Sequence, residues 1–223
     1  FEVYYQPILN SADRIIGAEA LLRFFMHSDE GDEMISPVGE FVLDEAAKMC
    51  REMQQYIVDF RVNINVSYIQ IMRVKMANKI LTAIKANHLR PESICIEMTE
   101  SGFMDMTPYF CRFRKRLEDN KIQFIIDDFG TGYSNLRYIS EMNPDYVKID
   151  KDFTARAMRS EKDYELFRKI IEMVHSVNVK ICIEGIEKEE WACAMKEIHV
   201  DYMQGYLYGR PCEKGVFLKE YNK

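Results

Sequence analysis

The chain has 223 residues, 48% of them hydrophobic and 30% charged, which is typical of a folded globular protein rather than a disordered one. Its net charge of −6 argues against a nucleic-acid polymer as partner, because such proteins carry a basic stripe. The charge does not exclude a small phosphorylated ligand held by metal ions.

No apolar run approaches the ~20 residues that cross a bilayer, and no signal peptide is visible. We therefore expect a cytoplasmic protein, or the cytoplasmic part of a membrane-anchored one. Because the chain opens with Phe1 rather than Met, we expect one domain over residues 1–223, excised from a longer protein.

Short apolar runs alternate with helical patterns along the chain. The apolar runs predict strands at 3–8, 15–22, 60–66, 94–98, 123–127, 145–149, 179–184 and 200–207. The helical patterns cover 37–56, 68–86, 107–119, 163–177 and 188–198, and the third opens with the cap signal Thr107-Pro108. This alternation indicates a parallel sheet covered by helices, and about eight strands in ~220 residues favour a closed (β/α)8 barrel of the TIM type.

Polar residues lie near the carboxyl ends of successive predicted strands. Burial of charge at such positions is costly unless the charge is paired or bound to metal. They are Glu19, Asn65, Glu97, Asp127 with Asp128, Lys148, Glu184 and Gln204. Any one of them alone is explained as a helix cap or a local ion pair. Such residues on seven successive strands instead predict one site at the mouth of the barrel.

Carboxylates with one amide suit hard cations such as Mg²⁺ or Mn²⁺, and the histidines are too scattered to predict zinc. Neighbouring strand residues point to opposite faces unless the chain is already turning. We expect Gly130-Thr131-Gly132 to supply that turn, so that one carboxylate of Asp127-Asp128 can bridge two metals while the other binds one.

At these residues the chain resembles the EAL-domain family of cyclic di-GMP phosphodiesterases. The matching segments are Tyr5-Gln6-Pro7-Ile8, Glu19-Ala20-Leu21-Leu22-Arg23, Asn65-Val66-Ser67, Glu97-Met98-Thr99-Glu100-Ser101, the segment from Asp127 to Ser134, Lys148-Ile149-Asp150, Glu184-Gly185-Ile186-Glu187 and Gln204-Gly205-Tyr206. They follow the family order from end to end. The resemblance implies a TIM-like barrel with an antiparallel first strand, and Mg²⁺- or Mn²⁺-dependent hydrolysis of cyclic di-GMP to linear 5′-pGpG.

The resemblance also assigns roles. Glu19, Asn65, Glu97 and Asp127 match the ligands of one metal, and Asp127 and Asp128 share the second. Lys148 matches the residue that orients the attacking water, Glu184 the general base, and Gln204 a residue that holds water or the metal shell. Arg23 is expected to bind a ligand phosphate, and Gln6, Leu22 and Asp150 match family positions that contact the ligand, although these three matches are less specific. Glu100 and Glu187 match residues that support the ligands, and Glu100 would anchor the loop after Asp128.

The family further implies a homodimer and invites an upstream sensory or GGDEF domain. One departure stands out: some fifteen residues of the family pattern are missing between Pro37 and Val38, and we expect that the printed sequence omits them.

Alternatives to an enzyme remain open. The domain could be a receptor that binds cyclic di-GMP without cutting it, although such receptors lose metal ligands and this chain has lost none. It could also be a protein-interaction domain, against which the acidic mouth argues. The basic run Arg112–Arg116 is interpreted as a solvated helix face, and Cys95 and Cys182 as buried reduced thiols.

Overall fold

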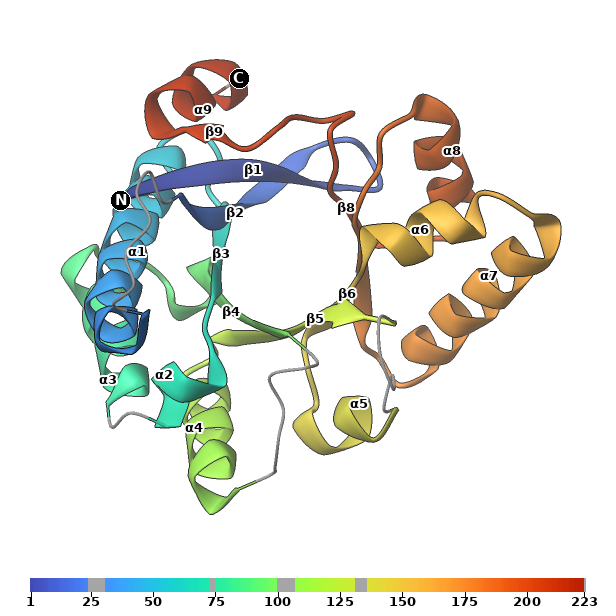
Figure 1. The fold of residues 1–223 in the computed structure, drawn as a ribbon. Coiled ribbons are helices and arrows are strands. Elements are labelled where there is room, and N and C mark those ends of the chain that lie inside the picture. Colours follow the sequence, from blue (N-terminus) through green and yellow to red (C-terminus); the bar gives the residue numbers. More distant parts are fainter. Residues whose placement is uncertain (24–30, 73–74, 100–106, 131–135, 223) are drawn as a thin grey trace.

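A computed structural model describes residues 1–23, 31–72, 75–99, 107–130 and 136–222 (Figure 1). The strands are β1 (Glu2–Asn10), β2 (Ile15–Arg23), β3 (Arg61–Asn65), β4 (Ile94–Thr99), β5 (Gln123–Phe129), β6 (Tyr146–Ile149), β7 (Lys180–Ile183), β8 (Tyr202–Met203) and β9 (Cys212–Glu213). The helices are α1 (Gly31–Met53), α2 (Tyr68–Met72), α3 (Met76–Ala86), α4 (Pro108–Asp119), α5 (Leu136–Met142), α6 (Lys151–Ala157), α7 (Glu161–Ser176), α8 (Glu189–Glu197) and α9 (Lys214–Tyr221), with a 3₁₀ turn at Pro91–Ser93.

The strands close into a barrel. Their order is β2-β3-β4-β5-β6-β7-β8-β1, and β1 pairs back onto β2, so that the sheet forms a ring with helices outside it (Figure 1). Strands β2 to β8 are parallel, whereas β1 is antiparallel to both β2 and β8. The predicted barrel with an antiparallel first strand is therefore confirmed.

The apolar core has two layers, one inside the ring and one between the ring and its helices. The inner layer consists of Ile8, Cys95, Ile125, Tyr146, Cys182 and Tyr202. Both predicted buried cysteines lie here, and burial raises the pKa of their thiols. Because side chains two positions apart share a face of a strand, this apolar plug determines which residues face the mouth above it.

Several predicted elements differ from the structure. The predicted helix 68–86 comprises two helices, α2 and α3, and the predicted strand 200–207 is reduced to the two residues of β8. The first helix spans Gly31–Met53 rather than 37–56, and Pro37 and Val38 are consecutive residues inside it. Tyr56, which the helical pattern had included, lies beyond its end and is 54% exposed.

Apolar spacing alone also placed some exposed side chains on buried faces. Phe41, Ile69 and Leu166 fit the helical patterns, yet they are 39%, 47% and 54% exposed. By contrast, the predicted cap of α4 is confirmed, because the Thr107 hydroxyl accepts a hydrogen bond from the Phe110 N–H at 3.2 Å. None of the helices in the described part of the chain is both long and apolar enough to cross a membrane.

Helix α9 was not predicted, because its apolar pattern is weak, yet it covers the outside of β1. Phe217 is fully buried and its ring packs edge-on against Tyr5 and Phe60, with centroids 6.2 and 6.1 Å away. Phe217 therefore anchors this helix to the barrel, together with Tyr221, whose hydroxyl donates to the Tyr208 carbonyl oxygen at 2.9 Å.

We expect Phe217→Ala to lower the free energy of unfolding by about 3–5 kcal/mol, the range for emptying a large aromatic site in a core. The neighbouring Val216 is 42% exposed. Val216→Ala is the matched control and should change stability by no more than about 0.5 kcal/mol. Urea unfolding followed by circular dichroism measures both, and equal effects for the two variants would contradict the assigned packing of α9.

Candidate active site

Five of the predicted polar residues converge because each lies two positions after a residue of the apolar plug. This spacing relates Cys95 to Glu97, Ile125 to Asp127, Tyr146 to Lys148, Cys182 to Glu184, and Tyr202 to Gln204. In antiparallel β1 the direction is reversed, so that Gln6 comes two positions before Ile8 and pairs with Glu19 across the sheet. The carboxyl ends of the parallel strands therefore present one ring of polar side chains.

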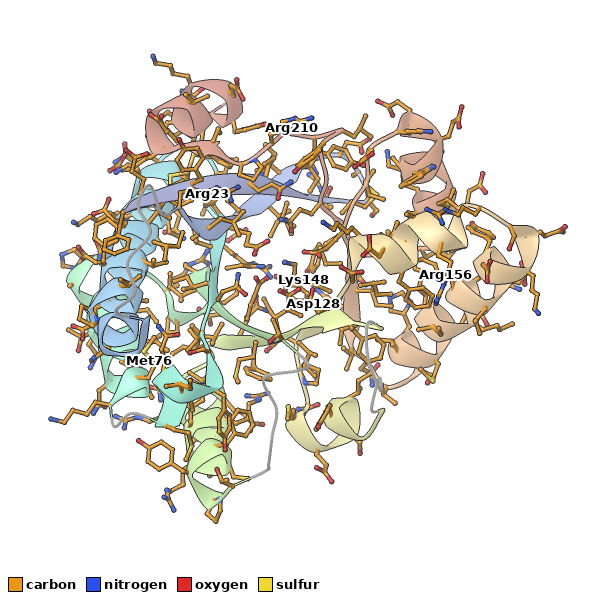
Figure 2. The ribbon with its side chains drawn as sticks, viewed as in Figure 1. Arg23, Met76, Asp128, Lys148, Arg156 and Arg210 are labelled. Carbon is orange, nitrogen blue, oxygen red and sulfur yellow. The ribbon has the colours of Figure 1, made fainter. Side chains whose placement is uncertain are left out.

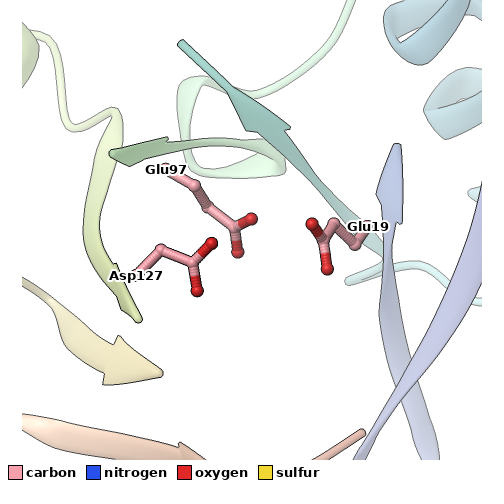
Figure 3. A group of neighbouring side chains, drawn as sticks. All are labelled: Glu19, Glu97 and Asp127. Carbon is pink, nitrogen blue, oxygen red and sulfur yellow. The ribbon is translucent and has the colours of Figure 1, made fainter. Parts of the chain in front are cut away.

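Three carboxylates form the centre of this ring. Glu19, Glu97 and Asp127 are all buried and point toward one another from three strands (Figure 3). One oxygen of each lies within 4.8 Å of the others, and the same holds for Asp127, Asp128 and Glu184. Asp127 belongs to both groups, as the predicted bridging ligand requires.

Asp127 and Asp128 both reach the site because β5 bulges between them. The register with β6 shifts between Ile126 and Phe129, which inserts one extra residue on β5. Asp128 has φ 56°, in the left-handed region, and its N–H donates to Asp127 Oδ1 at 2.9 Å. The chain therefore already turns at Asp128, and Gly130 of the predicted turn also has a positive φ, 102°; Thr131 and Gly132 lie outside the described residues.

Lys148 is fully buried among these carboxylates (Figure 2). Its Nζ lies 2.7 Å from Glu184, 2.9 Å from Glu19, 3.4 Å from Glu97 and 3.6 Å from Asp127. Burial alone would lower the pKa of this ammonium, but the four carboxylates raise it well above its ordinary value. Lys148 is therefore charged, and one positive charge faces five acidic groups when Asp128 is included.

The carboxylates respond unequally to this shortage of positive charge. Burial raises the pKa of Glu97, Asp127 and Asp128, and it raises that of Glu184 to about 7. Glu19 is also desolvated, but Lys148 and hydrogen bonds from Gln204 and Asn65 bring its pKa below the ordinary value. Without further cations the mouth cannot hold all five groups ionised at neutral pH.

An amide chain completes the ring on the β1 side. Gln204 Nε2 donates to Glu19 Oε2 at 2.8 Å and to Gln6 Oε1 at 3.1 Å, and Asn65 Nδ2 donates to Glu19 Oε1 at 2.8 Å. Gln204 Oε1 is buried and has no hydrogen-bond partner among the described residues. An orphaned acceptor beside an acidic cluster fits a bound water or metal shell, so these residues suit a divalent cation.

Not every predicted residue reaches the cluster. Leu22 packs against the core on the helix side of β2, on the face opposite to Glu19, so its side chain does not point into the mouth. The carboxylate of Asp150 accepts the Asp152 N–H at 2.8 Å and caps α6, although Asp150 also raises the pKa of Asp128 electrostatically, after burial and Asp127. Arg23 lies at the exposed end of β2, its guanidinium 5.9 Å from the Tyr4 ring centre. Glu187 is exposed, and Glu100 lies outside the described residues.

Asn63 was not predicted as a site residue. It is 2% exposed, and its Nδ2 donates to Glu97 Oε1 and to the Tyr146 hydroxyl, both at 2.5 Å. One oxygen of Glu97 is thereby held from below, while the other faces Lys148 at 3.4 Å. Its position in the sequence could have indicated this role. Asn63 is a polar residue in an apolar strand, and it lies two positions before Asn65, so that both face the same side.

Comparisons with known proteins agree with this geometry. A family model described as the EAL domain matches residues 1–211. The bifunctional diguanylate cyclase/cyclic di-GMP phosphodiesterase MucR of Pseudomonas aeruginosa is 30% identical over 226 residues, covering 94% of this chain and 33% of that protein.

Two solved structures are also similar. The EAL enzyme Bd1971, in its cAMP- and cyclic-di-GMP-bound form, superimposes with a TM-score of 0.91 at 29% identity, covering 99% of this chain and 64% of that one. The PaMucR phosphodiesterase in complex with c-di-GMP gives a TM-score of 0.86 at 28% identity, covering 97% and 93%. The chain belongs to the EAL-domain family, which confirms the identification made from sequence, and it spans about a third of the length of the curated relatives it matches.

The unequal pKa values predict how the metal-free protein responds to pH. The pKa of Glu184 is about 7 in the folded state and 4.5 ordinarily. Between pH 4.5 and 7 the folded state therefore keeps a proton that the unfolded state has lost. Stability should therefore fall as pH rises from about 5 to 8, by about 1.4 kcal/mol for each unit of pKa difference.

Thermal melts in chelator across this range measure the effect. Glu184→Gln should reduce the decline without removing it, because the pKa values of Glu97, Asp127 and Asp128 are also raised, whereas Glu190→Gln, at an exposed residue of α8, should leave it unchanged. A metal-free protein whose stability rises from pH 5 to 8 would contradict the assigned electrostatics.

The position of Asn63 predicts an effect on metal binding. Asn63→Leu keeps the size of the side chain and removes the donor to Glu97. We expect the apparent affinity for Mn²⁺, measured by calorimetry, to fall about tenfold or more, since residues that hold metal ligands typically contribute this much. An unchanged affinity in a folded variant would mean that Glu97 is positioned without Asn63.

Proposed function

We propose that this domain hydrolyses cyclic di-GMP to linear 5′-pGpG with the help of Mg²⁺ or Mn²⁺, two ions per site. The observation that carries the proposal is the single buried ammonium of Lys148 among five acidic groups, a deficit of positive charge that divalent cations would correct. The named activity of MucR and the c-di-GMP complex of PaMucR support the choice of substrate.

The residues that would hold the cations come from four adjacent strands. Glu19, Asn65, Glu97 and Asp127 are the candidates for one ion, and Asp127 with Asp128 for the other. When bound, such ions draw the substrate phosphate into the acidic mouth and stabilise the charge that develops during hydrolysis.

Glu184 and Lys148 are placed to act on the attacking water. Their side chains are 2.7 Å apart, and a carboxylate that stays ionised beside cations can accept a proton as a general base. Lys148 orients the water molecule. The oxygen of this water attacks phosphorus, and Glu184 accepts a proton from the water. The bond from phosphorus to the 3′ oxygen breaks, and the leaving oxygen takes up a proton, which gives a 5′ phosphate and a 3′ hydroxyl.

The remaining predicted contacts surround this centre. Gln6 and Gln204 lie beside Glu19, where the free Gln204 Oε1 can hold a water. Arg23, at the open end of β2, offers the planar guanidinium that binds phosphate with two hydrogen bonds. Since the side chain of Leu22 faces the helix side, it contributes at most its backbone to the ligand.

Three further points stay predictions. The chain as one domain of a longer protein, the homodimer and an upstream sensory or GGDEF domain rest on the family resemblance. A receptor that binds cyclic di-GMP without hydrolysis is the alternative function. The presence of every predicted metal ligand in the chain argues against it.

Replacement of two glutamates separates the proposed roles. Glu184→Gln should lower kcat by about 10²-fold or more, the typical cost of losing a general base, with little loss of nucleotide affinity. Glu19→Gln should weaken both Mn²⁺ and nucleotide binding, because the phosphate is held largely through the cations. Chromatography of linear product with Mn²⁺, together with calorimetry, measures both variants.

Two results would contradict these assignments. If the folded wild-type protein binds cyclic di-GMP tightly but forms no linear product with either metal, the domain is a receptor. If Glu184→Gln abolishes binding as fully as Glu19→Gln, then Glu184 is a metal ligand and the base lies elsewhere.

A further inference from the structure

A hollow of about 230 Å³ lies outside the barrel, between the start of α3 and the side of α4. Its floor is apolar and includes Met76 and Phe113, and Tyr109 stands at its side. Three cations line it: Lys75, Arg112 and Arg116. Figure 2 labels Met76 at this edge of the molecule, away from Lys148 at the centre of the ring.

The basic run on α4, interpreted from the sequence as a solvated helix face, has three different environments. Arg114 is buried, with its guanidinium donating to the carbonyl oxygens of Met142 and Asn143 at 2.8 and 2.5 Å. Lys115 lies 3.5 Å from Asp119 on the exposed side. Arg112 and Arg116, one helical turn apart, instead share the face that lines the hollow.

No acidic partner of Lys75, Arg112 or Arg116 is found among the described residues. Arg112 lies over the Tyr109 ring, 5.6 Å from its centre, which orients the guanidinium without neutralising it. These three cations therefore bring positive charge together at the hollow that no described carboxylate neutralises, although the net charge of the chain is −6.

Helix α3 adds positive potential on the opposite side of the same hollow. Lys75 precedes the helix with φ 99°, and no side chain caps the first turn. The amino end of this eleven-residue helix therefore keeps N–H groups open beside Ala77 and Asn78, which also line the hollow.

We propose that this hollow is a binding site for a small molecule carrying two or more phosphoryl groups, such as the diphosphate portion of a nucleotide. Two guanidiniums, an ammonium and a helix amino end match the charge and hydrogen-bonding capacity of a diphosphate. A hollow of this size suits a small ligand rather than a nucleic-acid polymer, which requires an extended basic stripe. The site is separate from the acidic mouth and does not depend on the proposed hydrolysis.

Pyrophosphate is the probe for the test. Calorimetric titration in chelator removes any contribution of divalent cations at the mouth, so binding reports on the hollow. We expect the wild-type protein to bind pyrophosphate, and the double variant Arg112→Ala/Arg116→Ala to bind about tenfold more weakly or worse, since charge-assisted hydrogen bonds are lost. Lys115→Ala, on the same helix but paired with Asp119, is the matched control and should bind as the wild type does.

Two outcomes would overturn the proposal: no binding of pyrophosphate by the wild-type protein, or equal binding by the wild-type protein and the double variant. Cyclic di-GMP turnover with Mn²⁺, measured on the same proteins, separates this site from the mouth. The double variant should retain wild-type turnover while losing pyrophosphate binding, and loss of both activities together would place the anion at the mouth instead.

Discussion

The buried ammonium of Lys148 is the interaction on which the site depends. It lies within 3.6 Å of four carboxylates that come from β2, β4, β5 and the end of β7. A single charge at such distances attracts each carboxylate strongly in a water-poor mouth, yet it cannot satisfy all of them. The pKa values of Glu97, Asp127, Asp128 and Glu184 are therefore raised. Burial is the main cause of each rise, and repulsion from the neighbouring carboxylates adds to it.

The barrel makes this arrangement possible. A closed ring of strands brings residues that are far apart in sequence to one end, and the period of two along each strand lifts them above an apolar plug. The reversed direction of β1 is part of the same geometry, because Gln6 reaches the mouth only by preceding Ile8. The apolar plug fills the barrel below the mouth, and Asn63 connects the plug to the mouth by donating hydrogen bonds to Tyr146 and Glu97.

The barrel could be predicted from the alternation of strand and helix patterns along the sequence. The centre of the site could be predicted because a carboxylate at the end of an apolar strand is costly to bury unless it binds a cation or pairs with one. Features that depend on local backbone geometry could not be predicted. The left-handed conformation of Asp128, the bulge beside it and the use of Asp150 as a helix cap are decided by register and turn geometry, which the residue types alone do not reveal. The strand pattern does predict that Leu22, three positions after Glu19, faces the opposite side of β2. The family resemblance nevertheless favoured a ligand contact for it.

We infer that divalent cations gathered around Asp127 complete the acidic mouth. A crystal grown with Mn²⁺ and cyclic di-GMP, measured for anomalous scattering from manganese, tests it most directly. We expect two anomalous peaks about 3.5–4 Å apart with the Asp127 carboxylate between them, one of them beside Glu19 and Glu97. A mouth without peaks, in which Lys148 alone still contacts the four carboxylates, would contradict it.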